Sequence, residues 1–163
     1  MPDPIDLKAY LRSMKYSQLS SFEYLEDTPF ATGSFGQLYR GQLKTGEQVV
    51  MKILRPSVIK YLKYDLRLLR VLCSGYSMLD SDEMMDFMQI YREFRRTCFE
   101  EIDYRRECEL GQVYYDTYQN HPEVVIPKTY PLLSNNIVLV QEYIDGLSMT
   151  KVLAVQPQSS PAP

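Results

Sequence analysis

The stretch Ala31–Lys52, ATGSFGQLYRGQLKTGEQVVMK, decides the fold. It predicts a short strand, a glycine-containing loop, and two further strands joined by a tight turn at Lys44–Glu47. These strands cover Gln37–Arg40 and Val49–Leu54, where aromatic and β-branched residues suit a half-buried pleated surface. Lys52 lies in an otherwise apolar run. Because a strand buries a lysine only where an anionic group receives its ammonium group, Lys52 is the first candidate functional residue.

The glycine loop also supports a ligand-binding site. Gly33 and Gly36 bracket Ser34 and Phe35, and without a Cβ atom the backbone can bend and approach a ligand closely. In a protein-kinase N-lobe, a glycine hairpin covers nucleotide phosphates and a strand lysine reaches them. The loop by itself favours an ordinary hairpin, since Ala31 stands where the kinase pattern has its first glycine. The apolar strand that carries the lysine shifts the interpretation towards a nucleotide site.

The length and composition limit the class of protein. The 163 residues suggest one domain, and 45% apolar with 24% charged residues is an ordinary globular mixture. A net charge of −3 gives no nucleic-acid footprint, so no nucleic-acid partner is expected. No segment approaches the roughly 20 apolar residues that cross a bilayer, and the N-terminus shows no secretory signal. The three cysteines, which lack metal-ligand spacing, are interpreted as reduced, buried thiols of a cytoplasmic protein: Cys73, Cys98 and Cys108.

The rest of the chain predicts an α+β fold. Hydrophobic periodicity predicts helices at residues 6–20, 58–73 and about 82–118, the last with a cap at Ser81 or Asp82. Alternating apolar segments place the first strand, which enters the glycine loop, at residues 22–30 and predict two more strands at 128–133 and 137–144. The result is a five-stranded antiparallel sheet with a long helix against it and an extra helix after the lysine strand. We expect an N-terminal helix in 1–20, a lobe in 21–153 and a disordered proline-rich tail in 154–163.

Two charged helical stretches are informative. The first carries a basic stripe, interpreted as a solvated face, with an anionic lipid or partner surface as the alternative: Lys60, Lys63, Arg67 and Arg70. In the second, Asp103 and Glu107 are four residues apart on a helix and repel each other by a few tenths of a kcal/mol. A facing cation would remove that cost, and Lys52 is the natural candidate for Glu107. The alternative is a solvated face with Glu101 and Arg105 as a local pair.

These segments together resemble the UbiB (AarF) family of atypical kinase-like proteins, which is linked to ubiquinone and other quinone or lipid biology. The similarity covers roughly residues 22–153 and rests on four motifs: the alanine-rich nucleotide loop (Gly33–Arg40), the lysine strand K-V-x-R-P (Lys52–Pro56), the D-L-x-x-L helix (Asp65–Leu69) and E-x-D-Y-x-x-E (Glu101–Glu107). The resemblance implies a protein-kinase-like N-lobe, with the last motif on its long C-type helix. It also implies quinone biosynthesis as the biological setting.

The resemblance implies a role for each site residue. Lys52 would pair with Glu107 and hold the α- and β-phosphates of ATP or ADP, so these two are the candidate catalytic residues. Glu101 and Asp103 would be the family's E-x-D carboxylates. Gln141–Gly146 resembles a kinase hinge, whose adenine contacts would come from the Glu142 carbonyl and the Ile144 N–H. The other implied nucleotide contacts are Ala31, Gly33, Ser34 and Gly36 in the loop, with Leu38 and Val50 on either side of the base.

The sequence departs from the family pattern in three places. Gly33 stands where the family commonly has alanine, and no N-terminal K-x-G-Q extension is recognisable, since Lys15–Gln18 has serine for glycine. The partner of Glu101 and Asp103 is therefore open. After the hinge there is neither a catalytic aspartate with an asparagine five residues on nor a D-F-G metal ligand. No residue is assigned to a metal, and Mg²⁺ is expected only with a supplied C-lobe.

Two function hypotheses follow. The first is the nucleotide-binding N-lobe of a UbiB-like atypical kinase or ATPase that lacks its C-lobe, with weak nucleotide binding and no phosphate transfer by this chain alone. The second is a non-catalytic, pseudokinase-like interaction module, with the C-lobe or another protein as the partner. Both predict exposed apolar surface near the hinge and the sheet edge. A cytoplasmic protein is expected, with peripheral membrane contact as an open alternative.

Overall fold

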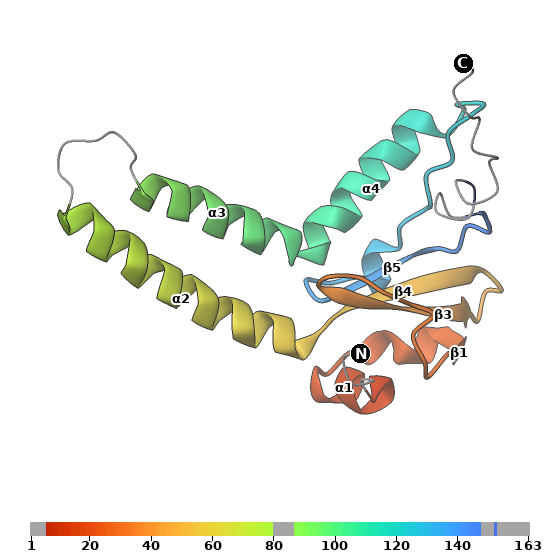
Figure 1. Cartoon of the computed structure of the whole chain (residues 1–163). Helices are drawn as coiled ribbons and strands as arrows, with labels where there is room; N and C mark the ends of the chain where they lie inside the picture. The colour runs from red at the N-terminus through yellow and green to blue at the C-terminus, as the bar shows by residue number, and fades with distance from the viewer. Residues whose placement is uncertain (1–5, 80–86, 148–151, 153–163) are drawn as a thin grey trace, which may run out of the picture.

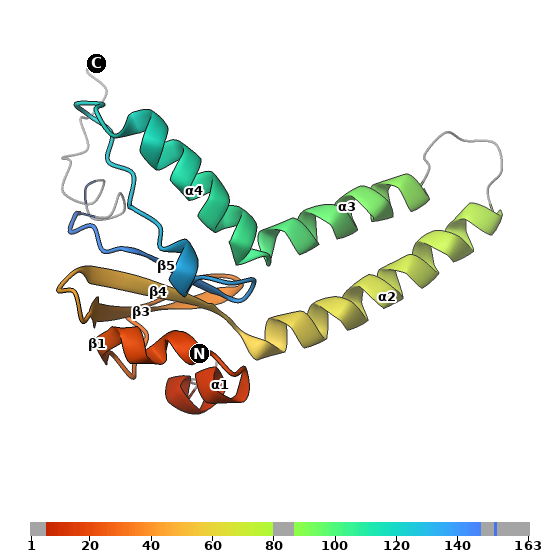
Figure 2. The ribbon, with the colours of Figure 1, turned by 180° about the vertical axis from the view of Figure 1, so that it is seen from behind.

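The structure is a computed structural model that describes residues 6–79, 87–147 and 152. The expected tail at 154–163 and the expected helix cap at Ser81 or Asp82 lie outside these residues. A twisted antiparallel sheet lies between a short N-terminal helical segment on one side and helix α4 on the other (Figure 1). Two long helices, α2 and α3, extend away from the sheet side by side, as Figure 2 shows from behind.

The sheet has five strands in the order β1-β3-β4-β5, with β2 paired to β3 off this path. Every pairing is antiparallel. The strands are β1 (Phe22–Leu25), β2 (Ala31–Thr32), β3 (Gly36–Leu43), β4 (Gln48–Leu54) and β5 (Val138–Glu142). The predicted class and strand number are therefore confirmed. The predicted turn between β3 and β4 contains Gly46, whose φ of 101° lies in the left-handed region that favours glycine.

The membership of the sheet differs from the prediction at two places. The segment 22–30 does not form one strand, because β1 ends at Leu25 and the short strand β2 follows at Ala31. The predicted strand at 128–133 is wrong, because only Thr129 makes an isolated bridge, to Gln141, and Pro131 begins the short 3-10 helix η2 (Pro131–Leu133). Proline has no N–H group for a strand ladder, which explains why the pairing stops there.

Local contacts and residue types determine where the helices begin and end. At the N-terminus, α1 (Leu7–Ser13) and the 3-10 helix η1 (Ser17–Ser21) replace the single predicted helix. Between them Lys15 has a φ of 53°, and buried Tyr16 donates its hydroxyl to the Leu133 carbonyl at 2.7 Å. A continuous helix would not bring Tyr16 to that carbonyl. Helix α2 (Pro56–Leu79) begins at a proline, which the first turn of a helix tolerates, and runs beyond the predicted end at Cys73.

The long C-type helix is in fact two helices, α3 (Phe87–Glu101) and α4 (Tyr104–Tyr118). The break falls at Ile102 and Asp103. The Asp103 carboxylate accepts a hydrogen bond of 3.1 Å from the Arg105 N–H and thereby caps α4. Ile102, 9% exposed, belongs to the core. The predicted repulsion of two carboxylates on one continuous helix therefore does not arise, because Asp103 satisfies the first turn of the helix that carries Glu107.

One hydrophobic core joins the sheet to both neighbouring layers. Leu7 and Leu11 of α1 are buried in the same cluster as Met51 of β4 and Tyr104 and Cys108 of α4. The expected N-terminal segment therefore shares the core of the lobe. The predicted burial of the three cysteines is right only for Cys108, since Cys73 and Cys98 are half-buried. In the described part of the chain, no helix has the length and apolar character needed to cross a membrane.

Candidate functional site

Strand β4 places Lys52 in the middle of one face of the sheet. It lies directly across from Leu38 on β3 and from Leu139 on β5. Since side chains alternate along a strand, Leu38, Val50 and Lys52 point to the same face. The implied placement of Leu38 and Val50 on either side of a base is therefore corrected, since both lie on one side of it. Val50 is 6% exposed and Leu38 is half-buried, so an apolar floor leads to the lysine.

Lys52 forms an ion pair with Glu107 in the first turn of α4. Its Nζ atom lies 2.7 Å from Oε2 and 2.8 Å from Oε1 of Glu107. The same atom lies 4.7 Å from the centroid of the Tyr104 ring, within reach of a cation–π attraction. The predicted contact between Lys52 and Glu107 is therefore confirmed. Since 28% of the Lys52 side chain and 45% of the Glu107 side chain are exposed, the pair stands at an open surface.

The glycine loop folds tightly against Tyr104 and the end of β4. Gly33 donates its N–H to the Gly36 carbonyl at 2.9 Å, which closes a turn over Ser34 and Phe35. Gly36 itself is buried, and a Cβ atom there would collide with the Tyr104 hydroxyl and lie 2.9 Å from the Ile53 carbonyl. The absence of a Cβ at Gly36 thus makes room for Tyr104. At Gly33 the nearest atom to such a Cβ is 3.8 Å away.

Arg55, just beyond the end of β4, holds the loop from below. Its Nη2 atom donates to the Gly33 carbonyl at 2.9 Å and also to the Ser34 carbonyl. Its backbone N–H donates to the Phe35 carbonyl at 3.0 Å. Three consecutive loop carbonyls are therefore directed at one residue. Because these partners are neutral, none of these bonds compensates the charge of the guanidinium group.

Two buried donors beneath the loop have no hydrogen-bond partner. They are Nε of Arg55 and the hydroxyl of Tyr104, and they are the only such side-chain atoms among the residues that the structure describes. Tyr104 is 1% exposed. Burial, followed by the nearby Glu107 carboxylate, raises the pKa of Tyr104, while Arg55 lowers it. The hydroxyl therefore keeps its proton, and a buried donor without an acceptor costs free energy.

The hinge segment lies at the end of β5. Glu142 donates its N–H to the Lys128 carbonyl at 2.8 Å, and its carboxylate accepts the Lys128 N–H at 3.1 Å. Neither bond uses the Glu142 carbonyl, which is the group assigned to adenine. Ile144 is 42% exposed and Leu147 78%, so the predicted exposed apolar surface near the hinge is confirmed.

A stack that the sequence did not predict links the hinge to the loop entrance. The Arg40 guanidinium lies 4.7 Å from the centroid of the Phe30 ring and 5.0 Å from that of Tyr143. Phe30 precedes β2, and Tyr143 follows β5. Arg40 pairs with Val50 across the strands, so the stack borders the apolar floor.

The two E-x-D carboxylates are not brought to the lysine. Asp103 caps α4, and Glu101 is an exposed residue at the end of α3. The local pair proposed as an alternative, Glu101 with Arg105, is replaced by one between Arg106 and Glu100 at 2.7 Å. Within the described ranges, no group of three or more histidine, cysteine, aspartate or glutamate side chains is placed to hold a metal ion.

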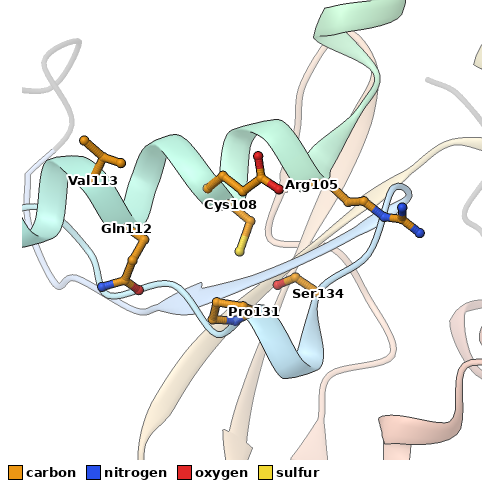
Figure 3. Close-up of a pocket in the computed structure, with 7 residues that line it drawn as sticks. Arg105, Cys108, Gln112, Val113, Pro131 and Ser134 are labelled. Atoms are coloured by element: carbon orange, nitrogen blue, oxygen red, sulfur yellow. The ribbon is translucent and has the colours of Figure 1, made fainter.

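In the described part of the chain, cavities also lie away from the lysine. One of about 480 Å³ separates α4 from η2, and Figure 3 shows the Cys108 thiol directed from the helix towards Pro131 and Ser134. Another, of about 470 Å³, is lined by Tyr10 of α1 and by the exposed basic residues Lys60, Lys63 and Arg67 of α2. Neither includes Lys52, Glu107 or the glycine loop.

The sequence missed Tyr104 and Arg55 as site residues, although both stand inside quoted motifs. Arg55 is the arginine of K-V-x-R-P, and Tyr104 is the tyrosine of E-x-D-Y-x-x-E. The signal was therefore present in the pattern, but only the three-dimensional contacts show that both reach the glycine loop.

The class of protein is defined by a five-stranded antiparallel sheet. Its strand β4 carries a lysine that is paired to a glutamate on a neighbouring helix. This arrangement is the N-terminal lobe of a kinase-like fold. Residues 7–161 match the ABC1 atypical kinase-like domain. The chain therefore belongs to this family of atypical kinase-like proteins.

Individual relatives agree with this membership. The chain is 27% identical over 150 residues to a probable protein kinase UbiB from Sodalis glossinidius, with 91% of the chain and 28% of the relative covered. It is 29% identical over 137 residues to the chloroplastic protein ACTIVITY OF BC1 COMPLEX KINASE 8 from Arabidopsis thaliana, with 82% and 18% covered. The chain thus spans less than a third of the length of either relative.

A solved structure matches the fold. The Rv3197–erythromycin complex from Mycobacterium tuberculosis superposes with a TM-score of 0.79 at 23% identity, covering 94% of this chain and 39% of that one. This likeness concerns the fold, which is the open antiparallel sheet with its helices described above.

Proposed function

We propose that this chain is the nucleotide-binding lobe of an ABC1 atypical kinase-like protein and that it takes ATP or ADP. The observation that carries the proposal is the ion pair between Lys52 and Glu107 at 2.7 Å, beside the Tyr104 ring that also borders the glycine loop. A lysine held by a helix glutamate is directed towards the phosphates that a glycine loop covers. The relatives named as kinases support the same assignment.

The adenine base would lie on the apolar floor formed by Leu38 and Val50. Its edge would meet the Glu142 carbonyl and the Ile144 N–H, and Ala31, Gly33, Ser34 and Gly36 would lie over the phosphates. The half-exposed side chains at this face suit a ligand that is only partly enclosed. Because small-molecule sites usually bury most of their ligand, a lobe alone binds nucleotide weakly.

Phosphate transfer requires more than this lobe. The 163 residues contain no D-F-G sequence. Metal ligands and a catalytic aspartate would come from a C-lobe, and Mg²⁺ would arrive with the nucleotide. Within the longer protein, the reaction proposed is phosphoryl transfer or ATP hydrolysis, in a setting of quinone biosynthesis.

Calorimetric titration with MgADP and MgATP tests the proposal. We expect a binding isotherm for the natural chain and a loss of affinity of about ten-fold or more for Lys52→Met, because the phosphate cation is removed. The matched control is Lys63→Met, which removes a lysine of equal charge from α2 and leaves affinity unchanged. Absence of binding by the natural chain, or equal losses in both variants, would contradict the assignment.

A non-catalytic interaction module is the second candidate. It is favoured by apolar side chains exposed around η2 and α4, among them Leu132 at 89% and Val113 at 59%. Val113 borders the cavity shown in Figure 3. Sedimentation of the purified chain across a concentration series tests it: self-association that Leu132→Ser and Val113→Ser abolish supports an interface, whereas a monomer throughout that also binds no hydrophobic dye argues against one.

A further inference from the structure

The glycine loop covers two donors that lack acceptors, Arg55 Nε and the Tyr104 hydroxyl. Different elements position the two donors: Arg55 directly follows β4, and Tyr104 is the first residue of α4. Tyr104 contacts the space where a side chain at Gly36 would stand, and its ring also lies 4.7 Å from Lys52 Nζ. Tyr104 therefore lies between the loop and the lysine, and Arg55 is bonded to the loop itself.

The charges in this region are unevenly compensated. Lys52 is neutralised by both oxygens of Glu107. The Arg55 guanidinium instead donates to the neutral carbonyls of Gly33 and Ser34. A cation that is held only by neutral acceptors, with one N–H unpaired, has both charge and a donor available for an anion.

Phosphate oxygens supply what both groups lack. They are anionic acceptors, and arginine binds them with particular geometric advantage. The loop that covers the donors is exposed at Ala31, Gly33 and Ser34, and its closure depends on bonds between Arg55 and two loop carbonyls. If phosphate oxygens replaced those carbonyls as the acceptors of Arg55, the loop would lift. Both donors would then become accessible at the same time.

We propose that Arg55 and Tyr104 are phosphate-binding residues, which the glycine loop covers in this structure and which bind a diphosphate group when the loop lifts. The inference deepens the proposed function, because it assigns further contacts to the same site. It adds a second, uncompensated cation to Lys52 and a neutral hydroxyl donor. It also gives the loop two positions, one bound to Arg55 and one displaced by the ligand.

A hydroxyl deletion separates this role from a structural one. Because the Tyr104 hydroxyl has no partner, Tyr104→Phe is expected to leave the unfolding midpoint unchanged or raised. The same variant is expected to weaken diphosphate binding several-fold, through the loss of one donor. The matched control is Tyr16→Phe, which removes a hydroxyl bonded to the Leu133 carbonyl. It is expected to lower the midpoint and leave binding unchanged.

The charge of Arg55 is tested in the same way. Arg55→Gln is expected to reduce affinity for a diphosphate about ten-fold or more, because a charge-assisted bond is lost. It is also expected to speed hydrogen exchange of the amides of 33–36, since the loop loses its anchor. Arg106→Gln, which removes an arginine paired with Glu100, serves as the charge-matched control for both measurements.

The experiment titrates the natural chain and the four variants with inorganic pyrophosphate and with MgADP, following amide shifts by NMR. Pyrophosphate binding that weakens in Tyr104→Phe and Arg55→Gln, and not in the controls, supports the inference. If pyrophosphate binds in this way and MgADP does not bind, the phosphate site stands and the nucleotide proposal fails. If MgADP binds but both variants bind it as the natural chain does, the inference is overturned and the proposed function stands. Absence of pyrophosphate binding also overturns the inference.

Discussion

Lys52 on β4 and Glu107 on α4 lie 55 residues apart in the chain and form a two-pronged ion pair of 2.7 and 2.8 Å. This contact joins the sheet to α4 at the edge of the core, immediately above the Tyr104 ring. It therefore fixes the position of the α4 N-terminus relative to the glycine loop.

Loss of the ion pair should affect binding far more than folding. Partly exposed ion pairs typically contribute about 0–1 kcal/mol, so Glu107→Gln is expected to lower the free energy of unfolding by no more than about 1 kcal/mol. Nucleotide affinity should still fall, because Lys52 loses the group that directs it. Urea unfolding beside calorimetry checks this. A large loss of stability with unchanged affinity would make the pair a structural element only.

The two loop glycines should respond differently to alanine. In Gly36→Ala the new Cβ atom would collide with the Tyr104 hydroxyl and the Ile53 carbonyl, so we expect a loss of about 1–3 kcal/mol. In Gly33→Ala the nearest atom to the new Cβ lies 3.8 Å away, and the φ of Gly33 is not positive. We therefore expect the free energy of unfolding to change by no more than about 0.5 kcal/mol. Thermal and urea unfolding compare the pair. Equal losses would show that the Tyr104 contact does not determine the choice of glycine.

The break between α3 and α4 should depend on Asp103. Asp103→Ala removes the cap of α4 and is expected to cost about 0.5–2 kcal/mol, whereas Asp103→Asn retains an acceptor and costs less. Glu101→Gln, at an exposed helix end, is the control and should change stability by less than about 0.5 kcal/mol. Circular dichroism during urea unfolding measures all three. If Asp103→Ala is as stable as the control, the cap does not hold the helix start.

The sequence predicted the elements that carry strong local signals. The meander around the glycine loop, the Lys52–Glu107 contact and the five-stranded class follow from residue patterns and from the family motifs. The break at Ile102 was missed because the apolar spacing of a helix continues across it, although aspartate is a favoured N-cap residue. The segment 128–133 looked like a strand from its apolar residues, but Pro131 outweighs them. The bonds from Arg55 to the loop span more than 20 residues and leave no periodic signal.

Stability should fall in alkaline solution. Burial raises the pKa of Tyr10, Tyr16 and Tyr104 above the ordinary value of 10.0. The unfolded chain therefore loses these protons before the folded chain does, so the stabilisation is complete below about pH 10 and declines as the pH rises beyond it. Each tyrosine contributes a slope of at most about 1.4 kcal/mol per pH unit, reached only where its folded pKa lies well above the unfolded one. Urea unfolding between about pH 8 and 11.5 measures this slope, which is expected to be smaller in Tyr16→Phe. A free energy of unfolding that does not change with pH would contradict the burial of these tyrosines.

An NMR titration of the isotope-labelled natural chain with MgADP tests nucleotide binding beneath the glycine loop most directly. The largest amide shift changes are expected at 33–36, Lys52 and the hinge at 142–144, and Lys52→Met is expected to abolish them. Changes confined to the cavity between α4 and η2 or to the basic residues of α2, or no changes at all, would contradict the claim that this lobe binds nucleotide beneath its glycine loop.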